Sequence, residues 1–165
     1  MRWQPAVPVC EECGFDWNGS ASGAVEDVTA APATVAVALS AVSDPYRRVN
    51  GRWSAAMYVW HLVDALRVGT ERLLTVALEP DWGLVCWDER SLAEARRYEQ
   101  LSPAVGLVVL ERVARDWAEA AAVVPQEVLV QHPVLGTVTA ADLVRRDAHE
   151  VHHHVWDIAG SEPSH

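Results

Sequence analysis

The chain has 165 residues, half of them hydrophobic, and a formal net charge of -10 at pH 7. This length and apolar content suit a single domain with one substantial core. The arginines are scattered among acidic residues and form no basic stripe, so we expect no nucleic-acid partner. No run reaches the roughly 18 to 20 apolar residues that cross a bilayer, and the N-terminus lacks the apolar core of a signal peptide. We therefore expect a cytoplasmic protein with no membrane partner.

The first 19 residues are rich in proline and glycine and show no helical period, which predicts an irregular leader. The leader contains the pair Cys10 and Cys13 at C-x-x-C spacing. We place a helical domain over residues 20–159 and a short tail over 160–165.

Two helices are predicted in the first half of that domain. The first spans residues 20–42, with Pro32 either in its first turn or at a kink. Ser54 is a plausible N-cap for a second helix that reaches about residue 77, with apolar residues near helical spacing. A break follows, and residues 79–101 form a long connection with one short helical piece over 92–98.

The second half contains two further helices. Ser102 followed by Pro103 is typical of a helix start and predicts a third helix to about residue 124. Residues 128–138 are interpreted as a loop, after which Thr139 caps a fourth helix to about residue 158. Because no clear strand pattern appears, we predict an all-α four-helix bundle with one crossover connection, best placed at residues 79–101.

Histidines on two of these helices suggest a metal site. His149 and His153 are four residues apart and share one face of the fourth helix. His61 lies in the apolar middle of the second helix, where a neutral imidazole needs a partner. Alone, it is more often a hydrogen-bonded core histidine, but the pair on the fourth helix favours a ligand role. We predict that His61, His149 and His153 bind one divalent metal with an open coordination position.

Two aspartates are placed to orient these ligands. Asp64 follows His61 by three residues and Asp157 follows His153 by four, so each carboxylate could accept the second ring N–H of its histidine. The alternative is that both are solvated helix charges. His152 could instead close the coordination sphere as a fourth ligand.

Two segments resemble a known family: residues 58–64, with the sequence YVWHLVD, which follow Trp53 and Ser54, and residues 147–154, DAHEVHHH. They are similar to the DinB/YfiT-like superfamily of metal-binding four-helix bundles. The resemblance implies one metal, zinc first and nickel second, on His61, His149 and His153. It also implies transferases or isomerases that use a low-molecular-weight thiol such as mycothiol or bacillithiol.

The expected function is therefore a metal-dependent thiol transferase that acts on a small-molecule substrate. An open metal site lowers the pKa of a bound thiol and makes it nucleophilic. Tyr58 and Asp64 are candidates for handling a proton, and the candidate pocket walls are Trp60, Trp87 and Trp156.

Two alternatives stay open at this point. The same metal could activate water for hydrolysis. Alternatively, the chain is a non-catalytic metal-binding bundle, and in either case a homodimer is conceivable.

The cysteines allow several roles. The Cys10 and Cys13 pair could be half a zinc knuckle, a redox pair or a structural feature of the leader. A knuckle needs two more ligands, which Cys86 and His132 could supply if the fold brings those loops together.

Overall fold

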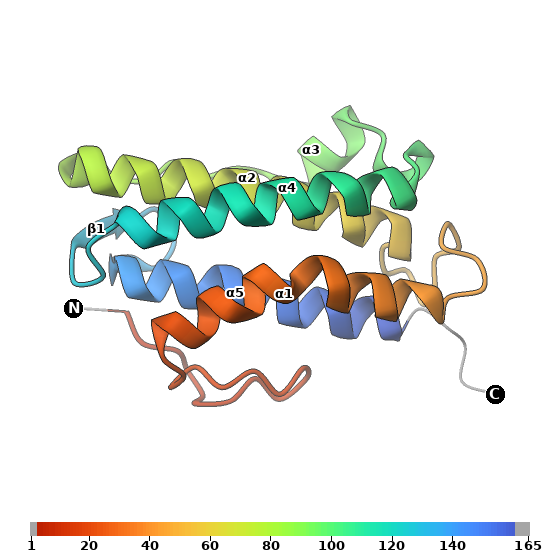
Figure 1. Cartoon of the computed structure of the whole chain (residues 1–165), viewed down its shortest axis with the longest axis horizontal. Coiled ribbons are helices and arrows are strands. Elements are labelled where there is room, and N and C mark those ends of the chain that lie inside the picture. The colour runs from red at the N-terminus through yellow and green to blue at the C-terminus, as the bar shows by residue number, and fades with distance from the viewer. Residues whose placement is uncertain (1–2, 161–165) are drawn as a thin grey trace.

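The computed structural model describes residues 3–160, in which four long helices form a bundle (Figure 1). These helices are α1 (Ala21–Ser40), α2 (Ala55–Leu78), α4 (Pro103–Val123) and α5 (Ala140–Ala159). Shorter elements connect them: η1 (Pro80–Trp82), α3 (Glu89–Ala95), η2 (Tyr98–Gln100), β1 (Leu129–His132) and β2 (Gly136–Thr139). The four-helix architecture expected from the sequence is thus confirmed. The predicted tail lies outside the described residues except for Gly160.

A capping side chain fixes the start of each long helix. The hydroxyls of Ser20, Ser54 and Ser102 each accept a hydrogen bond from a backbone N–H in the first helical turn. Thr139 forms a reciprocal capping box with Asp142. Such caps satisfy N–H groups that have no partner within the helix, and each contributes about 1 kcal/mol. This explains why the predicted helix starts agree closely with the observed ones.

The order of the helices requires one long return connection. The colour gradient in Figure 1 shows α2 and α4 running in the same direction, and α1 and α5 running together in the opposite one. Helix α2 packs against α4, and α1 packs against α5. Because α2 and α4 are parallel, the chain between them must travel back along the bundle, so residues 79–102 form the crossover.

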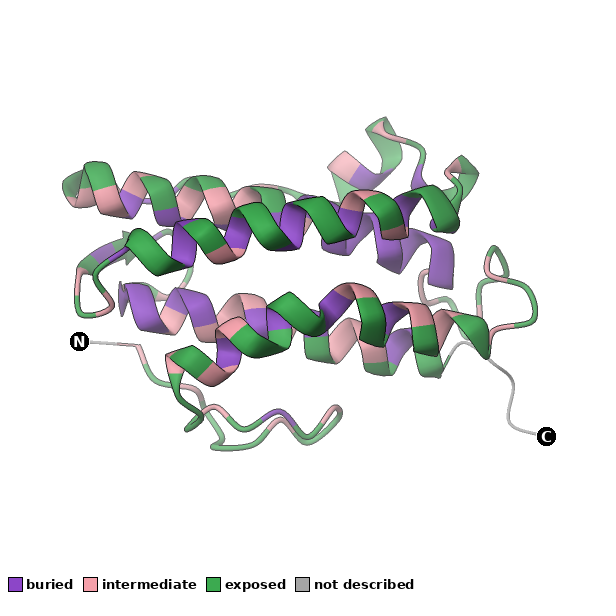
Figure 2. Cartoon of the chain, viewed as in Figure 1, coloured by how far each residue is buried: buried purple, intermediate pink, exposed green. Residues whose placement is uncertain are grey.

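The core lies between the four helices, where buried residues face inward and exposed ones face outward (Figure 2). Its largest fully buried side chains include Trp117, Tyr98 and Leu62. Helix α2 is the most deeply enclosed element, because every residue from Ala55 to Asp64 is buried. Within residues 3–160, no helix combines the length and apolar character that crossing a membrane requires.

Three local expectations differ from the structure. The stretch predicted as a loop over residues 128–138 contains the antiparallel pair β1 and β2, with Leu129 opposite Thr139 and His132 opposite Gly136. Four-residue strands give too short an alternation to recognise in a sequence. The short helix of the crossover begins at Glu89, because Asp88 caps it, rather than at residue 92. Of the two positions predicted for Pro32, the first turn is excluded, because Pro32 lies well inside α1.

Candidate metal centre

Two imidazoles and a carboxylate meet between α2 and α5. Nε2 of His61 lies 3.0 Å from Oε1 of Glu150, and Nε2 of His154 lies 3.2 Å from the same oxygen. The three side chains can each present one ligand atom, and these atoms all lie within 4.8 Å of one another. We call His61, Glu150 and His154 the His2Glu group.

The helices place these residues for simple reasons. Glu150 and His154 are four residues apart on α5, so their side chains lie one above the other on the same face. His61 points from the fully buried part of α2 and is itself inaccessible to solvent. A buried imidazole must find a polar partner, and Glu150 provides it.

Neighbouring side chains hold the His2Glu group in place. Nδ1 of His154 lies 2.8 Å from Oδ2 of Asp157, whose other oxygen is 2.6 Å from the Arg52 guanidinium. The ring of Tyr58 stacks on His154 at a centroid distance of 5.0 Å. The indole of Trp87 lies parallel to the His61 ring at 5.8 Å. Contacts from the bundle and from the crossover therefore fix the orientation of the His61 and His154 rings.

The electrostatics of this group favour a positive charge. Burial by itself would raise the pKa of Glu150, but hydrogen bonds from His154 and His61 hold that pKa well below its ordinary value. Burial by itself would lower the pKa of His154, but hydrogen bonds to Asp157 and Glu150 raise it to about 9. The two carboxylates thus stabilise a cation between them, either a proton on His154 or a metal ion.

A polar cavity of about 480 Å³ adjoins the group. Both histidines of the His2Glu group line it, together with Tyr58. The remaining lining is mostly charged and aromatic: Arg48, Arg52, Arg90, Glu89, Glu94, Glu99 and Trp53. A small polar molecule in this cavity would therefore contact both histidines of the His2Glu group.

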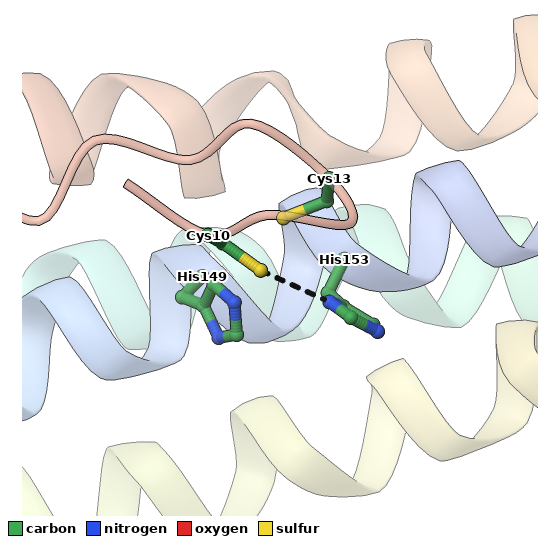
Figure 3. Close-up of side chains that lie close together, drawn as sticks. All are labelled: Cys10, Cys13, His149 and His153. Carbon is green, nitrogen blue, oxygen red and sulfur yellow. Dashed lines mark hydrogen bonds between the residues drawn. The ribbon is translucent and has the colours of Figure 1, made fainter. Parts of the chain in front are cut away.

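The other two predicted histidine ligands lie in a second group. It consists of two thiols from the leader and two imidazoles from α5, with ligand atoms within 4.8 Å of one another: Cys10, Cys13, His149 and His153. We call it the Cys2His2 group, and Figure 3 shows its side chains converging from the leader and the helix. Burial and the charge of His153 lower the pKa of His149 to about 4.

The structure therefore divides the three predicted histidines between two groups. His61 contacts Glu150 and His154, whereas His149 and His153 face the leader. The reason is the helical step of about 100° per residue, which turns Glu150 away from the direction of its neighbour His149. Glu150 and His154 were missed, although they have the same spacing of four and Asp157 follows at a suitable position. A single three-histidine centre stays a prediction.

The predicted proton-handling residues separate in space. Tyr58 lies beside His154 in the cavity, where burial and the Asp157 charge raise its pKa. Asp64 instead accepts hydrogen bonds from Tyr98 and Arg96 and forms an ion pair with Arg67. Its carboxylate therefore joins α2 to the crossover, and the structure does not place it in the cavity.

The predicted tryptophan walls also differ in position. Trp87 lies against His61, as described above. The Trp60 indole is buried and donates a hydrogen bond from Nε1 to the Ser102 carbonyl at 3.1 Å, which is a core role. Trp156 is more than a third exposed and carries the Arg52 guanidinium over its ring. Neither Cys86 nor His132 belongs to the Cys2His2 group.

Comparisons with known proteins agree with this architecture. The family model of the DinB superfamily matches residues 2–158 of the sequence.

The chain belongs to the DinB superfamily.

A solved structure with the same fold is that of YfiT from Bacillus subtilis, which is described as "a probable metal-dependent hydrolase with an unusual four-helix bundle topology". It superposes with a TM-score of 0.75 at 18% sequence identity, covering 96% of this DinB-superfamily chain and 91% of that protein. At this identity the likeness shows the fold alone. No curated protein sequence matches the chain.

Proposed function

We propose that this DinB-superfamily protein is a metal-dependent enzyme that holds one divalent cation on the His2Glu group and acts on a small polar substrate. The observation that carries the proposal is the position of the group: both of its histidines line the adjoining cavity. A substrate in that cavity would reach the ion directly. The YfiT protein, described as a probable metal-dependent hydrolase, shares the fold and adds support for metal chemistry in this architecture.

The donor set fits a catalytic ion. Two imidazole nitrogens and one carboxylate oxygen are ligands that zinc accepts, with zinc first and nickel second among the candidates. Three protein ligands leave at least one position for substrate or water, as catalytic zinc sites do. Asp157 would orient His154 through its Nδ1, a contact that typically raises metal affinity about 10- to 100-fold.

The favoured reaction is the transfer of a low-molecular-weight thiol. A divalent ion at the His2Glu group would lower the pKa of a coordinated thiol, so that the thiolate forms at neutral pH. In the reaction the thiol loses its proton, its sulfur forms a bond to an electrophilic carbon, and the leaving group departs with the electron pair. The similarity of residues 58–64 and 147–154 to the DinB/YfiT-like superfamily, which includes transferases and isomerases that use such thiols, supports this choice.

The chain's own residues would bind and position the reactants. The raised pKa of Tyr58 keeps its hydroxyl protonated, so it can donate a hydrogen bond to an anionic substrate group. The arginines of the cavity provide counter-charge for a carboxylate on the thiol or its partner. Trp87 covers one side of His61 and limits the access of water.

Hydrolysis is the second candidate, and one observation favours it: the description of YfiT as a probable metal-dependent hydrolase. The same open position would serve water in place of a thiol. The bound metal and the residues around it would be unchanged, so only turnover separates the two reactions.

The test compares the wild-type protein with His61→Ala, Glu150→Ala and His154→Ala, and uses the exposed His152→Ala on the same helix as the matched control. Metal content is measured by elemental analysis. Activity is measured with small thiols plus electrophilic aryl halides or unsaturated acids, and with activated esters for hydrolysis. We expect each of the three variants to lose one metal per chain and roughly 100-fold or more of turnover. The control should keep both its metal content and its turnover.

Three outcomes would contradict the proposal. A metal content equal to that of the wild type in all three variants would exclude the His2Glu group as a metal site. If His149→Ala and His153→Ala are added to the comparison, an ion that is lost from them and from His61→Ala, but kept after Glu150→Ala and His154→Ala, would instead support a single three-histidine centre. Stoichiometric metal with no turnover of any thiol or ester would favour the non-catalytic bundle.

A further inference from the structure

The leader contains a tight turn built around its two cysteines. Val9 pairs with Asp16 in an antiparallel bridge, and the Cys10 N–H donates to the Phe15 carbonyl at 2.9 Å. Within this turn the Gly14 N–H donates to the Cys10 carbonyl at 2.8 Å, with Gly14 in the left-handed region at φ 79°. The turn thus brings two thiols spaced C-x-x-C to the same side, as in the cysteine turns of structural zinc sites.

The leader is docked on α5, so the turn has a fixed partner. Phe15 is buried, and its ring lies 5.4 Å from the His149 ring, edge to face. The Trp17 ring lies 4.5 Å from His149 and 5.2 Å from Phe15, so the three rings pack together. Nearby, Nε of Arg145 donates to the Gly19 carbonyl at 2.7 Å. These contacts anchor the leader beside the histidine pair of the helix.

The four donors of the Cys2His2 group converge on one point. Sγ of Cys10 lies 3.9 Å from Nδ1 of His153, the contact drawn in Figure 3. A tetrahedral zinc with Zn–S of about 2.3 Å and Zn–N of about 2.0 Å separates its ligand atoms by about 3.3–3.8 Å. Because all four ligand atoms already lie within 4.8 Å of one another, small side-chain shifts suffice to enclose an ion.

Two further observations point to a ligand here. Nε2 of His149 is buried and has no hydrogen-bond partner, although a buried ring nitrogen ordinarily has one. On the outer side, Nε2 of His153 lies 3.5 Å from a Glu12 carboxylate oxygen. A carboxylate that accepts the second ring N–H is the usual neighbour of a metal-bound histidine, and it leaves Nδ1 free to bind the ion.

We propose that the Cys2His2 group is a structural zinc site that fastens the leader to α5. Zinc binding releases the two thiol protons, and the two thiolates balance the charge of the ion. Four protein ligands close the coordination sphere, so the site has no position for a substrate. The sequence placed Cys10 and Cys13 in a possible knuckle, and the fold supplies the two missing ligands from the histidine pair on α5.

The site is separate from the proposed catalytic centre, although both use α5. Glu150 of the His2Glu group lies between His149 and His153 in sequence, but its side chain contacts α2 rather than the leader. A protein that carries both ions would contain two metals per chain. Loss of either set of ligands would remove one of them.

The test compares the wild-type chain with the double variant Cys10→Ser, Cys13→Ser, both expressed in the presence of zinc. Cys86→Ser is the matched control, because Cys86 is exposed and lies outside the Cys2His2 group. We expect the double variant to lose one equivalent of zinc and the control to lose none. After replacement of zinc by cobalt, the thiolate-to-cobalt charge-transfer absorption should appear in the wild type and the control and be absent from the double variant.

A second variant keeps the proposal testable if the double variant misfolds. His153→Cys changes the ligand set to three thiolates and one imidazole, which zinc also accepts. It should retain the metal and intensify the cobalt charge-transfer absorption. The proposal is wrong if the reduced wild-type protein shows no thiolate-to-cobalt absorption. It is also wrong if Cys10 and Cys13 are recovered as a disulfide and the free thiols obtained by reducing it bind no zinc. Loss of metal from His61→Ala alone would leave these expectations unchanged.

Discussion

Asp64 provides a sharp test of whether an aspartate near a proposed metal ligand, here His61, is a structural or a functional residue. The sequence predicted that it orients His61 or moves a proton. In the structure its carboxylate is almost fully buried and accepts a hydrogen bond from the hydroxyl of Tyr98, which is itself inaccessible to solvent. Arg96 and Arg67 complete the network. We therefore predict that Asp64→Ala destabilises the fold and leaves metal binding intact.

The expected magnitude follows from the exposure of the partners. Removing the carboxylate leaves the buried Tyr98 hydroxyl without an acceptor, which costs about 1–3 kcal/mol. The side chains of Arg96 and Arg67 are 33% and 45% exposed, so water replaces part of what they lose, and each pair contributes at most about 1 kcal/mol. The sum is about 3 kcal/mol in the free energy of unfolding. For a chain of this length that corresponds to a fall in Tm of on the order of 10 °C.

The assay is urea unfolding of Asp64→Ala, Tyr98→Phe and the double variant, with metal content measured alongside. Because the two side chains share one hydrogen bond, the double variant should lose about 1–2 kcal/mol less than the sum of the single losses. Asp64→Asn keeps an oxygen acceptor for Tyr98 and should lose less than Asp64→Ala. Unchanged stability together with loss of metal from the His2Glu group would refute this reasoning and restore the orienting role.

Two further predictions concern the core and the hairpin. A Cβ added at Gly69 would overlap Oδ2 of Asp147 and lie 2.9 Å from Nε1 of Trp117, two atoms that hydrogen-bond to each other at 2.8 Å. Gly69→Ala should therefore lower the free energy of unfolding by about 1–3 kcal/mol despite the better helix propensity of alanine, and a stabilised variant in urea unfolding would contradict this. Burial and the Arg72 charge lower the pKa of His132 to about 4, so the folded state favours the neutral ring. The unfolded state binds the proton first as the pH falls. His132 should therefore lower the free energy of unfolding progressively as the pH falls from about 6.5 to about 4, by up to about 3 kcal/mol in total. His132→Asn keeps an acceptor for the turn N–H groups without titrating there, so its unfolding free energy should be less sensitive to acid, and an equal acid sensitivity would argue against His132 as the cause.

The helices were predictable because their signals are local. Ser54, Ser102 and Thr139 each combine a capping hydroxyl with a following helical segment, and a cap acts within one turn of its own residue. The hairpin of β1 and β2 was not predictable in this way. Only Val130 and Val138 supply clearly buried apolar positions on its strands, and their pairing depends on contacts across the turn.

The candidate site was predicted only in part. The residue types could be read from the sequence, but the rotation of α5 about its own axis could not. A buried histidine in α2 and histidines at a spacing of four in α5 directed attention to these two helices, on which candidate metal ligands do lie close together. The choice between the pair at 149 and 153 and the pair at 150 and 154 depends on which face of α5 meets α2. Sequence spacing is identical for both pairs, and only the packing of the bundle separates them.

The rotation of α5 about its own axis therefore links the two proposed sites. Its buried apolar residues, including Ala148, Val151 and Ile158, fix one face against the core and place the Glu150 and His154 pair against α2. A step of one residue along the helix turns a side chain by about 100°, so the same packing directs His149 and His153 toward the leader. A zinc ion that ties the leader to these two histidines would oppose rotation or fraying of this part of α5. Fastening the leader would in this way also hold Glu150 and His154 in the orientation that the proposed catalytic ion would need.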